Sequence, residues 1–208
     1  MTQTYSKTRV LVEGALMIAL STVLSFIPIM ELPHGGSITL LSMLPLVVMS
    51  FRHGAKWGLF TAFVHSLLQL FMGLKNLAYC QTVGAQVGCV LLDYLLAYTA
   101  LGLACVLAKP IKNKLTGAAL GTLGVCLLRY LCSTLSGYVV WKDYDYAFEW
   151  MTQFGWGAII ANMGENALCW LYSAVYNATY MLPEAVLTTI GAVILYKALP
   201  KLFAAQAH

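Results

Sequence analysis

Long apolar runs, separated by short segments rich in charges and turn residues, make up most of the chain. A helix needs about 20 mostly apolar residues to cross a bilayer, and the bilayer interior leaves open backbone groups without partners. The runs therefore predict about six transmembrane helices. The second run has about 14 residues, which allows a tilted or only partly spanning helix. The predicted spans are residues 10–30, 38–51, 57–74, 78–108, 115–141 and 166–199.

Composition agrees with this pattern. The 208 residues are 60% hydrophobic and only 10% charged, whereas a soluble domain has roughly 25% charged residues. So little polar surface excludes a large soluble domain, and it also excludes disorder, a coiled coil and collagen. The chain is predicted to be an all-α polytopic integral membrane protein that forms a single domain over residues 1–208.

Basic side chains are concentrated on one side of the predicted bundle. Cytoplasmic segments of membrane proteins are enriched in Lys and Arg, so this side is predicted to be cytoplasmic and to contain both termini. Lys75 and Lys142 fall outside, and Arg129 falls within a span. The nine cytoplasmic basic residues, of twelve in the chain, are Lys7, Arg9, Arg52, Lys56, Lys109, Lys112, Lys114, Lys197 and Lys201.

The predicted outer loops are acidic and rich in aromatic residues. The acidic residues are Glu31, Asp143, Asp145, Glu149 and Glu165. The aromatic residues could form a belt at the membrane interface, or they could shelter a pocket that opens to the outside. They are Trp141, Tyr144, Tyr146, Phe148, Trp150, Phe154 and Trp156.

The chain lacks the residues that several functional classes require. The net charge of +4 arises from the basic inner side, so it predicts no nucleic-acid partner. Neither a phosphate-binding GxxxxGK[ST] motif nor a CxxC or HExxH motif is present. No serine–histidine pair or acidic cluster suggests catalysis. The sequence therefore predicts a protein that is not an enzyme and has no metal site.

Three ionisable residues fall deep inside predicted spans, where they are costly and usually functional. They are Asp93, Arg129 and Glu184, which follows Pro183. One interpretation is an internal ion pair between Asp93 and Arg129 that joins two helices. The other leaves Asp93 to meet a cationic ligand, with Arg129 in a structural role.

Two helix faces could complete a binding site around Asp93. Ser133, Gly137 and Trp141 follow one another at steps of four and share a face of the fifth span, which predicts a slot beside an indole ring. The sixth span carries a tyrosine stripe and an amide that both donates and accepts hydrogen bonds. The stripe could instead be simple packing. Its residues are Tyr172, Tyr176, Asn177 and Tyr180.

A carboxylate, aromatic faces and an amide together suit a flat, cationic small molecule. Aromatic rings stack on such a ligand and attract its positive charge, while the carboxylate offsets that charge. The pattern predicts binding without chemistry on the ligand.

These residues resemble the substrate-binding (S) components of energy-coupling factor (ECF) vitamin transporters, specifically the thiamine-binding branch. The resemblance covers nearly the whole chain. It is carried by residues 15–19 (ALMIA), residues 32–45 (LPHGGSITLLSMLP), residues 92–94 (LDY), Arg129-Tyr130, Ser136-Gly137, Trp141 and residues 172–184. It implies six helices and a pocket near the outer face of the cell membrane.

The resemblance also implies which residues contact the vitamin. Thiamine binders of this kind use a carboxylate followed by tyrosine, a glycine with a tryptophan four residues later, and a Tyr-x4-Asn pair. This sequence departs by having aspartate where glutamate is frequent and Ser133 where a histidine is expected, so a thiamine precursor or analogue is the alternative ligand. The implied contacts are Asp93, Tyr94, Ser133, Gly137, Trp141, Tyr172 and Asn177.

Transport would require partners, because S components only capture the vitamin. The resemblance implies a transmembrane coupling (T) subunit and two ABC-type ATPases, with Ala15 and Ala19 on the docking face, and no cofactor besides the thiamine ligand. Packing of these alanines within the chain is an alternative, because small residues four apart are common in membrane helices. A small membrane enzyme or a structural membrane subunit is the remaining alternative function.

Overall fold

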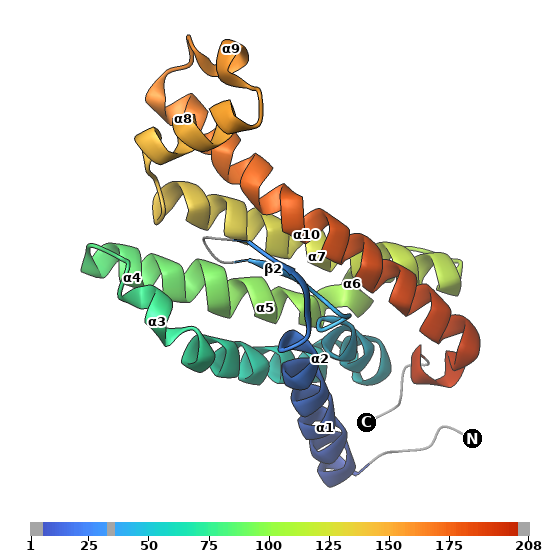
Figure 1. The fold of residues 1–208 in the computed structure, drawn as a ribbon. Helices are drawn as coiled ribbons and strands as arrows, with labels where there is room; N and C mark the ends of the chain where they lie inside the picture. The colour runs from blue at the N-terminus through green and yellow to red at the C-terminus, as the bar shows by residue number, and fades with distance from the viewer. Residues whose placement is uncertain (1–5, 33–35, 204–208) are drawn as a thin grey trace.

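The computed structural model describes residues 6–32 and 36–203, and it consists of helices with one short β-hairpin (Figure 1). The predicted all-α membrane fold is confirmed, with the hairpin as its one departure in the described residues. Four helical segments of this part of the chain are long and apolar enough to cross a membrane, so the count of six helices stays a prediction. These four are Lys7–Ser25, Val83–Ala108, Lys114–Val139 and Glu165–Ala198.

Helix α1 (Lys7–Ser25) ends before the predicted boundary at residue 30. Strand β1 (Pro28–Glu31) follows it and pairs antiparallel with β2 (Ser37–Thr39). Proline favours extended backbone in the residue before it, so the helix cannot continue smoothly into Pro28. The prediction of helix over residues 26–30 was therefore wrong, and so was that of helix at Ile38, which lies in β2.

The second and third predicted spans join in one long element, α2 (Leu44–Met72). It is broken at Gly54, whose φ of 80° and ψ of 175° are not helical. This conformation is open essentially to glycine alone. The break falls in the short charged segment between the two predicted spans, so the boundary was right although the first half begins later than predicted. The short helix α3 (Leu74–Leu77) follows.

The fourth predicted span is a helical segment of changing type. It runs through α4 (Val83–Cys89), the π-helical turn η1 (Val90–Leu96), α5 (Ala97–Thr99), the 3-10 turn η2 (Ala100–Leu103) and α6 (Ala104–Ala108). Its η2 turn lies directly against α2, since a side chain added at Gly102 would come within 2.6 Å of the Gly58 carbonyl oxygen. π-helical turns such as η1 often occur at functional sites, and Asp93 lies within η1.

Helices α7 (Lys114–Val139) and α10 (Glu165–Ala198) pack along each other more extensively than any other pair of described elements (Figure 1). Their bounds agree with the last two predicted spans within a few residues. α10 passes through Pro183 without ending. Between them, α8 (Tyr144–Gln153) and α9 (Gly157–Ile160) fold the predicted outer loop over one end of α10.

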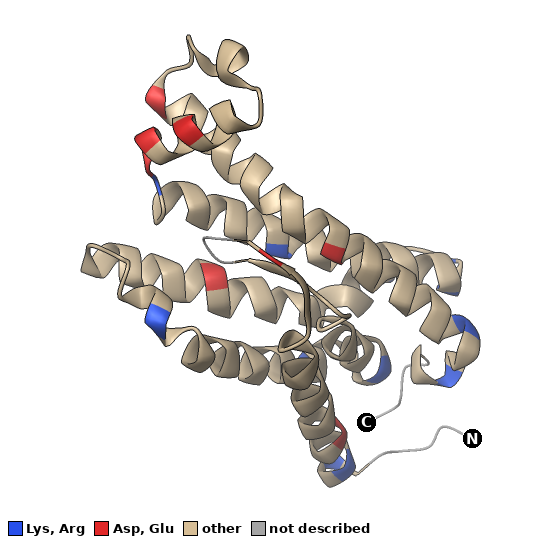
Figure 2. Cartoon of the chain, viewed as in Figure 1, with Lys and Arg blue, Asp and Glu red and all other residues tan. Residues whose placement is uncertain are grey.

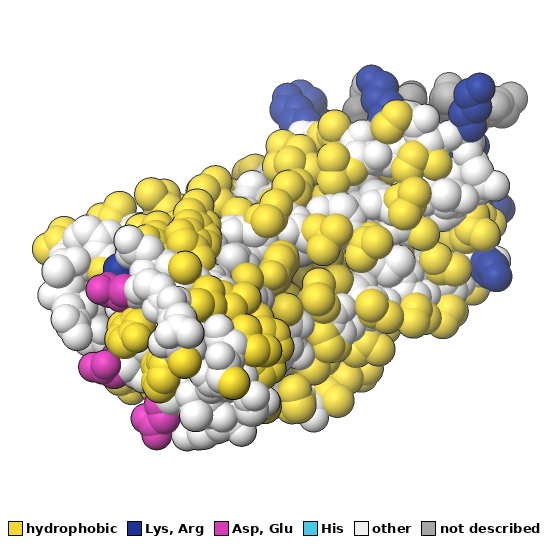
Figure 3. Space-filling model, turned by 90° about the horizontal axis from the view of Figure 1, so that it is seen from above, with side chains coloured by type: hydrophobic (Ala, Val, Ile, Leu, Met, Phe, Trp, Pro, Cys, Tyr) yellow, Lys and Arg dark blue, Asp and Glu magenta, His cyan; other side chains and the backbone are white. Residues whose placement is uncertain are grey.

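The first and last helical elements meet at the end of the bundle opposite to α8. The Arg52 side chain is bonded there both to Glu13 of α1, at 2.7 Å, and to the carbonyl of Lys201 in η3 (Pro200–Phe203), at 3.5 Å. Basic side chains gather toward this end and acidic ones around α8 (Figures 2 and 3). The arrangement agrees with the predicted separation of charge.

Candidate functional site

Asp93 accepts two hydrogen bonds from α7 and the segment that follows it. Its Oδ2 atom receives one bond from the Ser136 hydroxyl at 2.8 Å and another from the Trp141 indole nitrogen at 3.0 Å. Ser136 is fully buried, whereas Trp141 is exposed. The structure thus brings Asp93 and Trp141 together, as expected for one site. Sequence reasoning did not assign Ser136 to this site, although it directly precedes Gly137.

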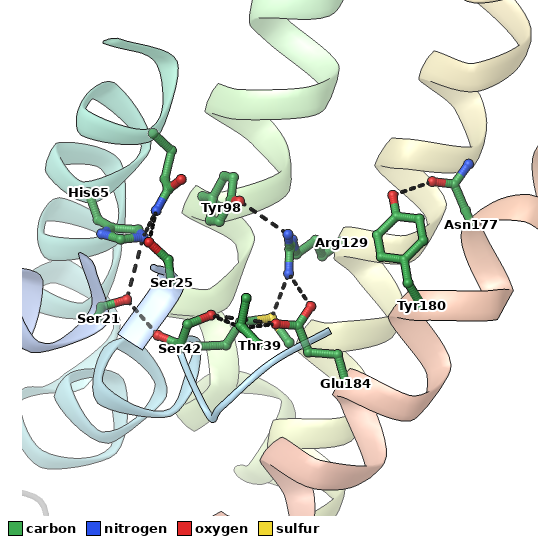
Figure 4. A network of polar contacts seen from close by, with 12 residues as sticks. Ser21, Ser25, Thr39, Ser42, His65, Tyr98, Arg129, Asn177, Tyr180 and Glu184 are labelled. Atoms are coloured by element: carbon green, nitrogen blue, oxygen red, sulfur yellow. Dashed lines mark hydrogen bonds and ion pairs between the residues drawn. The ribbon is translucent and has the colours of Figure 1, made fainter. Parts of the chain in front are cut away.

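Arg129 pairs with Glu184 of α10 (Figure 4). Its Nη1 atom lies 3.1 Å from Glu184 Oε2 and donates to the Met43 sulfur at 3.0 Å, while Nη2 donates to the Tyr98 hydroxyl at 3.2 Å. The internal ion pair between Asp93 and Arg129 is therefore not formed. Within the described residues, Asp93 has neutral hydrogen-bond partners and no cation within ion-pair distance.

Asn177 is buried and bonded to protein through both atoms of its amide. The oxygen accepts from Tyr180 at 2.6 Å (Figure 4), and the nitrogen donates to the Ser173 and Ser133 carbonyl oxygens at 2.9 and 3.3 Å. A ligand that bonded to this amide would have to replace one of these partners. Ser133 thus meets Asn177 through its backbone.

Gly137 lies at a close approach of α7 to α10. A side chain at this position would collide with the Ser173 hydroxyl, which itself donates to the Thr134 carbonyl at 2.7 Å. Ser173 therefore fills the space beside Gly137 where the sequence predicts a slot. Sequence reasoning did not identify Ser173, and its place three residues before Tyr176 gives no distinctive signal.

The tyrosine stripe of α10 is covered by aromatic residues from α8. The Tyr172 ring lies 5.8 Å from that of Tyr146 and 5.5 Å from that of Trp150, in both cases edge to face. Trp150 also approaches Tyr176 at 5.8 Å. Burial raises the pKa of Tyr146, so its hydroxyl stays protonated at neutral pH. Part of the aromatic loop therefore shelters the stripe, although the side chains of Phe154 and Trp156 are exposed.

The hairpin covers the same stripe from another side. Ile38 of β2 forms one buried cluster with Tyr176, Tyr180 and Met181. Leu32 packs against this cluster, which places the described ends of the 32–45 motif beside α10. Pro33, His34 and Gly35 lie outside the described residues.

Tyr94 points away from this group. Its hydroxyl donates to the Gly73 carbonyl at 3.2 Å and accepts from the Asn76 amide at 3.0 Å. Because these partners lie where α2 ends and α3 begins, the side chain fastens that turn. The structure thus places Tyr94 next to Asp93 in sequence but not in the same set of contacts.

The end of α7 and the start of α10 are joined beside Trp141. Lys142 lies 2.6 Å from the Glu165 carboxylate and 2.8 Å from the Asn166 side-chain oxygen. The Glu165 carboxylate raises the pKa of Lys142. Tyr138 donates to Asn166 at 3.2 Å, and its ring stacks on that of Trp170 with centroids 4.2 Å apart. These contacts limit the positions that Trp141 can take.

Neither of two hollows on the described surface is lined by Asp93 or Asn177. One lies between α8 and α10 and is lined in part by Trp150 and Thr179. The other lies between α1 and α2 and includes Ala15. Both Ala15 and Ala19 are exposed on α1, so they are open to a partner or to lipid rather than packed within the described chain.

The arrangement offers a negative charge, aromatic faces and an amide at one end of the bundle. Its polar atoms are bonded to protein, which stabilises the site while leaving the charge of Asp93 without an opposite charge nearby. No group of three or more His, Cys, Asp or Glu residues in the described part of the chain could hold a metal ion. The site is suited to binding a cationic, partly aromatic molecule.

Comparisons with known proteins agree with this chemistry. The chain matches the model of a family described as thiamine transporter protein (Thia_YuaJ) over residues 11–204. It is 29% identical over 203 residues to the thiamine transporter ThiT of Bacillus subtilis (strain 168), covering 92% of each chain. Among solved structures, it is similar to ThiT from Listeria monocytogenes, with a TM-score of 0.69 and 26% identity over 95% of this chain and 98% of the other. The S component of a bacterial ECF transporter has a similar fold, with a TM-score of 0.53 and 19% identity over 94% and 97% of the two chains.

Proposed function

Because the chain belongs to the thiamine transporter protein family, as its motifs predict, we propose that it is the S component that captures thiamine at the outer face of the cell membrane. The vitamin is bound near the outer ends of η1, α7 and α10. The protein holds its ligand without changing it chemically. This function accounts for a membrane protein whose polar site lies at one end of an apolar bundle.

The observation that carries the proposal is the charge of Asp93. An ionisable group inside a membrane protein is costly unless it is paired, and the partner that the sequence offers within a span, Arg129, is bound to Glu184. Ser136 and Trp141 orient the Asp93 carboxylate but do not neutralise it. Thiamine carries a permanent positive charge on its thiazolium ring, which supplies the missing partner.

The remaining contacts suit the other ring of the vitamin. An aminopyrimidine presents donors and acceptors on one edge, which match the two atoms of the Asn177 amide. Tyr172 and Trp141 supply flat faces against which the rings stack. Binding then replaces the present bonds of Asn177 to Tyr180 and to the backbone. Because buried polar groups without a partner are costly, the Tyr180 hydroxyl and the Ser173 carbonyl must find new partners in the complex.

Transport would use partners in the same membrane. The chain has no GxxxxGK[ST] motif, so energy from ATP would come from two ABC-type ATPases through a T subunit. Ala15 and Ala19 are exposed on α1 and would form the face that docks this subunit. Small residues let two helices approach closely in a bilayer.

Thiamine titration of the purified protein, followed by tryptophan fluorescence, tests the proposal. We expect saturable quenching at micromolar thiamine or below, because Trp141 lies 3.0 Å from the carboxylate that faces the ligand. Trp141→Phe should remove much of the quenching, whereas Trp57→Phe, a tryptophan in the second half of α2, should leave it. A wild-type protein that shows no binding at micromolar thiamine would contradict the proposal.

A precursor or analogue of thiamine is the second candidate ligand. Ser133 stands where thiamine binders of this kind have a histidine, and its side chain offers no ring for stacking. A panel of pyrimidines, thiazoles and flavins in the same titration separates the two candidates. If one of them binds more tightly than thiamine, the S-component function stands and the ligand changes.

A further inference from the structure

The hairpin lies directly against the face of α10 that carries Tyr176 and Tyr180. At Gly36, where φ is 89°, an added side chain would come within 2.7 Å of the Tyr180 ring. Ile38 is buried in the same cluster as the two tyrosines. The hydroxyl of Tyr180 in turn holds the Asn177 amide at 2.6 Å. The hairpin therefore covers the tyrosine face directly and is linked to Asn177 through Tyr180.

One carboxylate holds the end of the hairpin. Glu184 is 1% exposed, and its Oε1 atom accepts hydrogen bonds from the hydroxyls of Thr39 and Ser42, the latter at 3.4 Å. These two hydroxyls lie 2.6 Å apart. The other carboxylate oxygen of Glu184 is bound by Arg129 at 3.1 Å. Figure 4 shows this group below Tyr180, with residues from α7, α10 and the end of β2 converging on Glu184.

The turn that follows Thr39 is strained and held from two sides. Leu41 has a φ of 59°, in the left-handed region that residues other than glycine rarely adopt. Such a conformation persists only where the surrounding contacts impose it. Here Ser42 is bonded to Glu184 on one side, and its carbonyl accepts from Ser21 of α1 at 2.5 Å on the other. These contacts fix the end of β2 against both helices.

We propose that Glu184, oriented by Arg129, positions the hairpin on the tyrosine face and thereby sets how long the ligand stays bound. Burying two charges costs about as much as their attraction returns, so their pairing adds little to stability, but it fixes the place of the carboxylate. Glu184 is a positioning residue, since it acts on the ligand through the hairpin. The part of the proposal that concerns the ligand rests on the proposed function.

Thr39→Val tests the anchor with little change in shape, because only the hydroxyl that reaches Glu184 is replaced. Thr188→Val is the matched control: Thr188 lies one turn after Glu184, is fully buried, and its hydroxyl has no hydrogen-bond partner within the described residues. Thr39→Ser keeps the hydroxyl and should restore the wild-type behaviour. Glu184→Gln removes the charge of the anchoring carboxylate. If this variant does not fold, the comparison of Thr39→Val with Thr39→Ser and Thr188→Val still tests the anchor.

Amide hydrogen exchange of the ligand-free protein measures how often the hairpin opens. The Leu32 and Leu40 amides are bonded to the Gly36 and Ile27 carbonyls at 3.0 and 3.3 Å, so opening of the hairpin exposes them. We expect exchange in peptides covering residues 27–43 to rise about tenfold in Thr39→Val, with α7 peptides unchanged. Equal exchange in Thr39→Val and wild type would overturn the proposal, and so would an equal rise in Thr188→Val.

Stopped-flow fluorescence with thiamine measures the rates at which the ligand binds and dissociates. Thr39→Val should raise the dissociation rate about tenfold and change the association rate less, whereas Thr188→Val and Thr39→Ser should match wild type. Faster hairpin exchange with an unchanged dissociation rate would overturn the role in ligand retention. If the wild type bound no thiamine, the proposed function would fail, and the exchange measurement alone would still decide whether Glu184 anchors the hairpin.

Discussion

The charge of Asp93 can be removed while its shape is kept. Asp93→Asn should weaken thiamine binding about 10- to 100-fold, or about 1.5–3 kcal/mol, because the cationic ring loses its counter-charge. A neutral pyrimidine that lacks the thiazolium ring should bind the variant and the wild type almost equally. Isothermal titration calorimetry with both ligands measures the difference.

Asp143→Asn is the matched control for this substitution. Asp143 caps α8 by accepting from the Tyr146 amide at 2.9 Å, and asparagine caps a helix equally well. The affinity of the Asp143→Asn protein for thiamine should equal that of the wild type. An Asp93→Asn protein that retains full affinity for thiamine would show that this charge has no part in binding.

At this scale, the sequence identifies the important residues better than their partners. The placement of Asp93, Arg129 and Glu184 inside apolar runs marks all three, because charges there are rare. Which two of them pair depends on which helices are neighbours, and helical spacing within one span carries no such information. The resemblance implies that the adjacent Tyr94 belongs to the same site, and the structure shows its hydroxyl bonded to the turn between α2 and α3.

Among the helical elements, α2 and the η2 turn make a contact that allows no side chain between them. Gly102→Ala would bring a methyl group within 2.6 Å of the Gly58 carbonyl oxygen. Neither backbone can yield as a flexible side chain would, so we expect the free energy of unfolding to fall by about 3 kcal/mol, the upper end of overpacking costs. Unfolding in mixed detergent micelles, followed by circular dichroism, measures the loss.

Gly84→Ala provides the comparison within the same helical segment. Only the Thr82 hydroxyl would lie within 4 Å of the added methyl group, at 3.9 Å, and alanine favours a helix by up to about 1 kcal/mol over glycine. This variant should be as stable as the wild type or slightly more stable. If Gly102→Ala behaved in the same way, the close contact between α2 and η2 would be refuted.

The helices themselves were largely predictable, because membrane spans are long and apolar. The errors fall where a local residue overrides hydrophobicity. Pro28 interrupts the first apolar segment, whose end becomes the exposed strand β1. The strand that is buried against α10 is β2, and a buried strand needs the same apolar residue types as a buried helix. The π-helical turn at Asp93 has no signal that a sequence pattern reveals, because it changes the hydrogen bonding of the backbone without interrupting the helix.

On the scale of the whole molecule, the few charged residues separate into two functions. Most of them mark the two ends of the bundle (Figure 2), where the headgroup region and water accept them. The three that lie deep within the spans instead form two distinct groups. One is the Arg129–Glu184 pair, whose carboxylate is bonded to Thr39 of the hairpin, and the other is the carboxylate of Asp93. The Arg129–Glu184 pair is neutral as a unit, whereas no Lys or Arg of the described residues forms an ion pair with Asp93. In the proposed function, this carboxylate is the group that attracts the cation.

The exposed face of α1 lies on a different helix from the binding residues, which predicts that capture and transport can be separated. Ala19→Leu adds a large side chain to an exposed position, so thiamine affinity should stay within about twofold of wild type. Uptake into cells that supply the T subunit and the ATPases should fall at least about tenfold, because close helix approach needs small residues. Ala167→Leu, an exposed position on α10, should leave uptake unchanged. Normal uptake by Ala19→Leu would assign the docking face to another helix.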